Sequence, residues 1–166
     1  MQSTDGKRDV FIKTIQENEK LIFKVATFYT DSREDREDLV QEIIYNLWKS
    51  FDTFKQHSVL STWMYRVAMN VSIYHLKKSK KKIVSMAISE DVLNLQQPEN
   101  NATEDQWQSL QKHIQHLNLL DKGILMLYLE NKSHEEIAGI AGISKTNVGT
   151  RLSRIKEKLH QQTSKY

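Results

Sequence analysis

Hydrophobic residues recur along this chain at steps of three and four, the spacing of one face of an α-helix, and strong alternating patterns are absent. One proline and five glycines in 166 residues leave few points at which a helix must break. The pattern therefore predicts an all-α protein. In the first half we expect helices over about 9–29 and 34–50, separated by a short polar turn, and a third helix from Leu60 to Lys78.

A stretch of different composition separates this part of the chain from a second helical block. Residues 85–103 are rich in amides and acids, contain Pro98 and have few large apolar side chains after Leu95. A segment of this composition resists burial and is typical of a flexible linker. The sequence thus predicts two small helical domains, residues 1–84 and 104–166, joined by this linker, each with a modest core.

The second block contains the layout of a helix-turn-helix between residues 133 and 159. Ser133 and Glu136 have the spacing of a capping box, and Gly142 can take the positive φ of a tight turn. Ser144 can then cap a second helix. The apolar positions of that helix are Val148, Leu152, Ile155 and Leu159. Its polar and basic positions, suited to base edges and phosphates in a major groove, are Thr146, Asn147, Thr150, Arg151 and Arg154. The alternative is an ordinary helical hairpin with a solvated polar face.

The helix that starts at Leu60 carries a second polar face of interest. Its predicted apolar stripe consists of Leu60, Met64, Val67, Val71 and Tyr74. The neighbouring face carries Trp63, Arg66, Asn70 and Lys77. An aromatic ring, an amide and two cations on one side of a helix suit stacking on a base, reading its edge and holding the backbone. Five lysines between Lys77 and Lys82 add a phosphate-binding end. The alternative is a helix with one solvated face and a tryptophan that packs against its neighbours.

Composition narrows the class of protein. The net charge is only +3, but basic residues are concentrated locally, which favours nucleic-acid binding at chosen sites over a uniformly basic coat. The absence of cysteine excludes a disulfide scaffold and a zinc site with thiolate ligands. No apolar run is long enough to span a bilayer, and the polar N-terminus lacks the apolar core of a signal peptide. We therefore expect a soluble, cytoplasmic protein with no membrane insertion.

Three segments, taken in order, resemble bacterial RNA polymerase sigma factors of the extracytoplasmic-function class (group IV). The segment 35–48 resembles the helix that docks on the polymerase clamp. Phe54 and the segment 61–70 resemble the part that melts and reads the −10 element, and 117–159 resembles the domain that reads the −35 element. The resemblance covers nearly the whole chain in the family's order and spacing, which is more specific than a helix-turn-helix alone.

The resemblance implies a non-enzymatic protein without a cofactor, which binds core RNA polymerase and directs promoter-specific initiation of transcription. Its implied partners are promoter DNA and core RNA polymerase, through the clamp of the largest subunit and the flap region. An anti-sigma factor is a further partner that the resemblance suggests. The residues that it assigns to the −10 element are Trp63, Arg66, Asn70, Lys77 and Lys78. Those assigned to the −35 element are Lys145, Thr146, Asn147, Thr150, Arg151 and Arg154. Those assigned to polymerase binding are Asp38, Gln41, Glu42, Tyr45 and Asn46, whose acidic and amide groups suit a basic partner.

Three other functions stay open at this point. A stand-alone regulator would use the helix-turn-helix equally well, but it would leave the acidic helix 34–50 and the Trp63 face without a role. An enzyme is disfavoured because no phosphate loop or nucleophile motif is present. His113 and His116 lie one turn apart without further metal ligands, so no metal site is expected. An RNA-binding module built around Trp63 would prefer RNA to promoter DNA.

Overall fold

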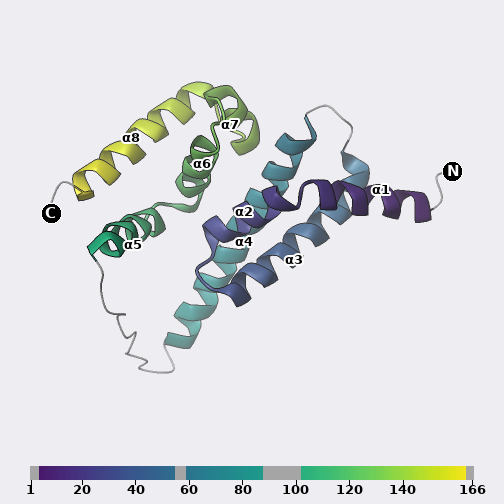
Figure 1. Cartoon of the computed structure of the whole chain (residues 1–166), viewed down its shortest axis with the longest axis horizontal. Helices are drawn as coiled ribbons and strands as arrows, with labels where there is room; N and C mark the ends of the chain where they lie inside the picture. The colour runs from purple at the N-terminus through teal and green to yellow at the C-terminus, as the bar shows by residue number, and fades with distance from the viewer. Residues whose placement is uncertain (1–3, 55–58, 88–101, 164–166) are drawn as a thin grey trace. The chain divides into compact units, whose positions relative to one another are not determined.

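The computed structural model describes residues 4–54, 59–87 and 102–163, with side chains described outside 80–107 and 162–163. Within these residues every regular element is helical, so the all-α prediction is confirmed (Figure 1). In chain order the helices are α1 (Thr4–Glu17), α2 (Glu19–Tyr29), α3 (Arg33–Ser50), the short 3₁₀ helix η1 (Phe51–Thr53), α4 (Leu60–Ala87), α5 (Ala102–Gln115), α6 (Leu119–Leu129), α7 (His134–Ala141) and α8 (Lys145–Thr163).

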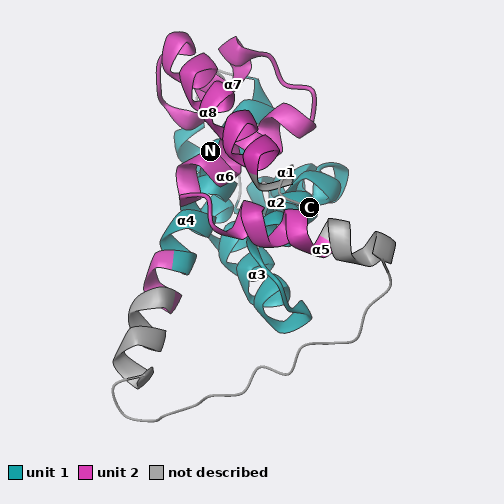
Figure 2. Ribbon diagram, turned by 90° about the vertical axis from the view of Figure 1, so that its left-hand side faces the viewer, with its two compact units in different colours: residues 1–76 teal, residues 77–166 magenta. Residues whose placement is uncertain are grey.

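The helices pack as two units, unit 1 with residues 1–76 and unit 2 with residues 77–166 (Figure 2). The prediction of two helical domains is confirmed, and the packing boundary falls inside α4. Because α4 continues to Ala87 and α5 begins at Ala102, both ends of the expected linker are helical. Its middle, residues 88–101, lies outside the described residues.

The first expected helix, 9–29, is in fact two helices that meet at Asn18. The dihedral angles of Asn18 (φ −118°, ψ 18°) lie outside the α-helical region, and its side-chain amide donates to the carbonyl oxygen of Thr14 at 2.9 Å. An asparagine side chain offers the backbone such a local partner, which favours breaks over helix interiors. The prediction of one continuous helix is therefore wrong. It rested on the apolar spacing, which continues unchanged from Ile15 to Ile22 and gives no sign of the break.

Unit 1 is built around the buried side of α3. This helix starts where Ser32 Oγ accepts a hydrogen bond from the backbone N–H of Asp35 at 3.1 Å. The buried hydrophobic residues of the unit are Phe11, Ile22, Val25, Ala26, Tyr29, Leu39, Ile43, Leu47, Met64, Tyr65, Ala68 and Met69. Burial raises the pKa of the Tyr29 hydroxyl above its ordinary value, so this group stays neutral in the core.

The buried side of α4 differs from the predicted apolar stripe. Tyr74, which the stripe included, is 67% exposed, whereas Ala68 and Ser72 are fully buried. The Ser72 hydroxyl donates to the carbonyl oxygen of Ala68 at 2.7 Å, which satisfies a polar group that would otherwise be costly to bury. Of the predicted stripe Met64 is fully buried, and Val67 is half-buried. The prediction followed large apolar side chains and missed a contact surface made partly of small ones.

In unit 2 the predicted helix-turn-helix is confirmed in α7 and α8. Ser133 Oγ accepts from the N–H of Glu136 at 3.1 Å, and a carboxylate oxygen of Glu136 accepts from the N–H of Ser133 at 3.2 Å. Gly142 ends α7 with a φ of 72°, and Ser144 Oγ accepts from the N–H of Asn147 at 3.1 Å near the start of α8. The buried hydrophobic residues of this unit are Leu117, Ile124, Leu125, Met126, Leu127, Ile137, Ile140, Val148, Leu152 and Ile155, with Leu159 half-buried.

Candidate nucleic-acid interface

One side of α8 packs on α6 and α7, so its opposite side faces outward. Of the residues predicted to contact the −35 element, those exposed on this helix are Lys145, Thr146, Thr150 and Arg154. The Thr150 hydroxyl donates to the carbonyl oxygen of Thr146 at 3.1 Å, which leaves its own oxygen able to accept. Thr146, Thr150 and Arg154 recur at steps of four, so two hydroxyls and one cation share an exposed face of α8 that suits base edges and phosphates.

Asn147 and Arg151 are placed differently, because both are partly buried. The guanidinium of Arg151 donates from Nε to Oδ1 of Asn147 at 3.1 Å and from Nη1 to Oδ1 of Asp121 at 2.8 Å. Asp121 belongs to the first turn of α6, so these bonds join two helices of unit 2. The helical period places Arg151 at the flank of the polar face. It could not predict Asp121 as the partner of Arg151, because Asp121 lies on a different helix.

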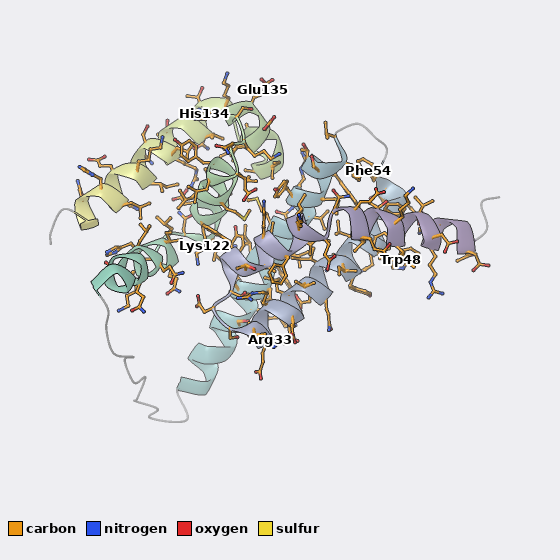
Figure 3. All side chains as sticks on the ribbon, in the orientation of Figure 1. Arg33, Trp48, Phe54, Lys122, His134 and Glu135 are labelled. Atoms are coloured by element: carbon orange, nitrogen blue, oxygen red, sulfur yellow. The ribbon has the colours of Figure 1, made fainter. Side chains whose placement is uncertain are left out.

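The start of α7 lies beside α8. A Cβ on Gly149 would lie 3.7 Å from Nδ1 of His134, an ordinary contact distance, so the imidazole rests against the backbone of α8. His134 and Glu135 are both exposed at this end of α7 (Figure 3). His134 is therefore a further polar side chain next to α8 to which the sequence pattern assigned no role.

In unit 1, Trp63 is held in a cluster of aromatic rings. Its ring centroid lies 4.9 Å from that of Phe54 and 6.4 Å from that of Phe51. The ring centroid of Phe11 lies 5.2 Å from that of Phe51 and 5.0 Å from that of Trp48, which extends the cluster. Trp63 is half-buried, so its packing partners set its orientation while part of the side chain stays accessible.

A groove of about 440 Å³ runs between α3 and α4 in unit 1. Its lining residues are Glu42, Tyr45, Asn46, Asn70, Val71 and Tyr74. Tyr45 and Tyr74 are 60% and 67% exposed as whole residues, and Asn70 is exposed. The structure thus brings Asn70, predicted to contact the −10 element, next to residues predicted to bind polymerase.

The carboxylate of Glu42, one of the residues that line this groove, contacts α4. Its Oε2 lies 3.0 Å from Nδ1 of His75, which joins α3 to α4. No part in this groove was predicted for Tyr74. Tyr74 follows Asn70 by four positions, and this spacing could have predicted that both side chains lie on the same face of α4. The remaining predicted residues do not line this groove but are exposed: Asp38 and Gln41 on α3, and Arg66, Lys77 and Lys78 on α4.

Two features of the described residues bear on the other functions. Among the described residues, no group of three or more histidine, cysteine, aspartate or glutamate side chains could hold a metal ion. His113 Nε2 instead lies 3.3 Å from the hydroxyl oxygen of Ser109. No helix in the described part of the chain is both long and apolar enough to cross a membrane.

Comparison with known proteins gives matches in both halves of the chain. Residues 14–82 match the family model described as Sigma-70 region 2, and residues 107–159 match the model described as Sigma-70, region 4. RNA polymerase sigma factor SigV of Bacillus subtilis is 25% identical over 168 residues, which cover 99% of this chain and 98% of that protein. ECF RNA polymerase sigma factor SigW of the same organism is 28% identical, over 97% of this chain and 92% of that protein.

Solved structures show the same fold. The sigma factor RpoE from Bartonella quintana, solved with the anti-sigma factor NepR, matches with a TM-score of 0.69 at 19% identity, over 93% of this chain and 96% of that one. CnrH, solved in complex with the cytosolic domain of CnrY, matches with a TM-score of 0.68 at 16% identity, over 98% of this chain and 93% of that one.

Proposed function

Since the chain belongs to the extracytoplasmic-function class of RNA polymerase sigma factors, we propose how its two halves divide promoter recognition between them. A sigma factor of this class is a non-catalytic protein that works with core RNA polymerase and directs promoter-specific initiation of transcription. We assign polymerase docking and −10 recognition to residues 1–84, −35 recognition to residues 104–166, and the linker to residues 85–103. The matched segments 14–82 and 107–159 lie within these bounds and support the assignment.

For −35 recognition, we assign the exposed face of α8 to the major groove. The observation that carries this assignment is a capped helix-turn-helix whose second helix buries its apolar side and exposes hydroxyls and cations, within the region 4 match. The residues assigned to this interface are Lys145, Thr146, Asn147, Thr150, Arg151 and Arg154. Lys145 and Arg154 would hold phosphates, and the shorter polar side chains would contact base edges. Arg151 is already bonded to Asp121 and Asn147.

For −10 recognition, we assign capture of an unpaired base to the groove between α3 and α4. A base that leaves the DNA stack needs a ring to stack on and a partner for its edge. The exposed rings of Tyr45 and Tyr74 can stack, and the amide of Asn70 in the same groove can bond a base edge. Trp63, oriented by Phe54, would support the junction with paired DNA. The backbone contacts are assigned to Arg66, Lys77 and Lys78.

For polymerase binding, we assign the exposed side of α3 to the clamp of the largest subunit, and unit 2 to the flap region. The docking residues are Asp38, Gln41, Glu42, Tyr45 and Asn46, whose acids and amides suit a basic partner surface. Glu42, Tyr45 and Asn46 also line the groove that contains Asn70. Polymerase and a captured base would therefore meet at neighbouring positions on unit 1.

An anti-sigma factor is the third class of partner that we propose, because RpoE was solved with the anti-sigma factor NepR and shares this fold. A protein that covers either interface would keep the chain from polymerase or promoter. We further infer that the chain acts in the cytoplasm, where RNA polymerase works.

Competition with a labelled primary sigma factor for core RNA polymerase tests the docking surface. The wild-type chain should displace the label, and Asp38→Lys with Gln41→Ala should not. The matched control is Asp9→Lys with Gln16→Ala on α1, which makes the same two changes at exposed positions. Displacement by both double variants would show that the docking surface lies elsewhere. No displacement by the wild type, together with sequence-specific duplex binding, would indicate a stand-alone regulator.

A second experiment separates the two roles assigned to the groove. Asn70→Ala should leave displacement unchanged and reduce opening of a supercoiled promoter, measured as reactivity of unpaired thymines to permanganate. Tyr45→Ala should impair displacement if its ring mainly contacts polymerase, and only opening if it mainly stacks on a base. If Asn70→Ala opens the promoter as well as the wild type, Asn70 does not capture a base.

A further inference from the structure

A chain of polar contacts joins α8 to the first turn of α6. Arg151 Nη1 donates to Oδ1 of Asp121 at 2.8 Å, and Arg151 Nε donates to Oδ1 of Asn147 at 3.1 Å. The side chains of Asp121 and Arg151 are only 14% and 29% exposed. The backbone N–H of Asp121 donates to Oδ1 of Asn118 at 2.8 Å, so the residue that bears the carboxylate is itself fixed at the start of α6.

These contacts fix the direction of the Asn147 amide. Arginine has N–H donors and no acceptor, so the atom of Asn147 that faces Arg151 has to be its carbonyl oxygen. A 180° turn of the amide would set donor against donor. The NH₂ group is therefore held away from Arg151. A base edge is recognised by its order of donors and acceptors, which an amide held in one orientation can match and a turning amide cannot.

The same contacts decide what Arg151 can do. Its guanidinium is held by a carboxylate through a charge-assisted hydrogen bond, whereas Lys145 and Arg154 on the same helix are exposed. A guanidinium bound in this way is withheld from DNA phosphates. Phosphate contacts raise affinity for every sequence and carry no sequence information.

We propose that Asp121 is a positioning residue for the reading of promoter sequence. It holds Arg151, and through Arg151 the amide of Asn147, so that α8 discriminates between bases instead of gaining one more phosphate contact. This inference rests on the proposed role of unit 2 in −35 recognition. It adds a residue of α6 that does not need to touch DNA.

Asp121→Ala separates this role from a simple effect of charge. Removal of an acidic group near DNA should, by charge alone, raise affinity for every sequence and leave the preference between sequences unchanged. Release of Arg151 predicts more than this. Affinity for a scrambled duplex should rise, and the slope of log K against log salt should steepen by about 0.9 for one added phosphate contact. Preference at the base pair read by Asn147 should fall about tenfold.

The experiment uses the full-length chain assembled with core RNA polymerase. The probes are a duplex library randomised over the upstream promoter segment and a scrambled duplex of equal length. The proteins are the wild type, Asp121→Ala, Arg151→Gln and the double variant. Asp121→Ala should change the salt slope in the wild-type background and not in the Arg151→Gln background, where no guanidinium can be released. Asp121→Glu, which keeps the carboxylate, should retain most of the base preference.

Glu135→Ala is the matched control, because it removes an exposed carboxylate from the helix-turn-helix without a contact to Arg151. The proposal is wrong if Asp121→Ala keeps the wild-type base preferences and changes the salt slope no more than Glu135→Ala does. In that case, if the wild-type protein still enriches one upstream sequence from the library, the −35 assignment stands and only the role of Asp121 is overturned. If the wild type enriches none, the inference and the −35 assignment are both overturned. If Asp121→Ala does not fold, Asp121→Asn keeps the side-chain shape and tests the same change.

Discussion

The turn of the helix-turn-helix offers a prediction in which one substitution has opposite effects at two nearby positions. Gly139 lies within α7, and Gly142 ends it with a φ of 72°. A Cβ added at either glycine would meet nothing within 4 Å. Alanine would therefore clash with no neighbouring residue at either position, and its effect on stability reports the backbone conformation alone. We expect Gly142→Ala to destabilise unit 2 and Gly139→Ala to stabilise it.

The size of each effect follows from the backbone conformation. An L-residue in the left-handed region costs roughly 1–2 kcal/mol. Alanine also lowers the entropy of the unfolded chain, which offsets about 0.4–1 kcal/mol of that cost. The net loss for Gly142→Ala is therefore about 1 kcal/mol. Within a helix, alanine is more stable than glycine by about 0.5–1 kcal/mol, which is the expected gain for Gly139→Ala. The two variants should thus differ by about 2 kcal/mol.

Hydrogen exchange of buried amides in α8 is the appropriate measurement, because it reports the opening free energy of unit 2 without a contribution from unit 1. Suitable probes are the amides of Val148, Leu152 and Ile155, whose side chains are buried in this unit. Their opening free energies should fall in Gly142→Ala and rise in Gly139→Ala. An unchanged or higher opening free energy in Gly142→Ala would refute the reasoning, because it would mean that the turn does not require a positive φ.

Three further changes test other parts of the molecule. Arg154→Ala should weaken binding to every duplex and reduce the salt slope by about 0.9, since one phosphate contact is lost; a salt titration beside Lys158→Ala, exposed on the same helix, measures this. Phe54→Ala should destabilise unit 1 by about 2 kcal/mol and slow promoter opening, because Trp63 loses the ring at 4.9 Å. Urea denaturation and permanganate reactivity are the two readouts, and normal opening would show that Phe54 does not position Trp63. The isolated fragment 104–166 should bind promoter DNA weakly, because it loses the effective concentration of a linked second site. Specific nanomolar binding by this fragment in a fluorescence anisotropy titration would contradict that expectation.

The helix-turn-helix could be predicted in detail because the interactions that define it are local. The capping box needs only Ser133 and Glu136 at a spacing of three, and the turn needs only a glycine at Gly142. The break at Asn18 is local as well, but its signal is a single side chain within an apolar spacing that continues. Tyr74 was misplaced for another reason. Which side of α4 is buried depends on its neighbours in unit 1, and small side chains such as Ala68 can form that contact.

Candidate contact residues were harder to predict than the helices that carry them. The helical period places a side chain relative to its own helix, whereas its bonding partner often comes from another helix. Arg151 lies at the flank of the polar face, as predicted, but its carboxylate partner Asp121 is 30 positions away in the sequence. Tyr45 and Asn70, assigned to different partners, line one groove only because α3 packs beside α4. A residue set taken from periodicity therefore overstates direct DNA contacts wherever a side chain is already bonded within the fold. The comparison of Asp121→Ala with Glu135→Ala measures this difference for Arg151.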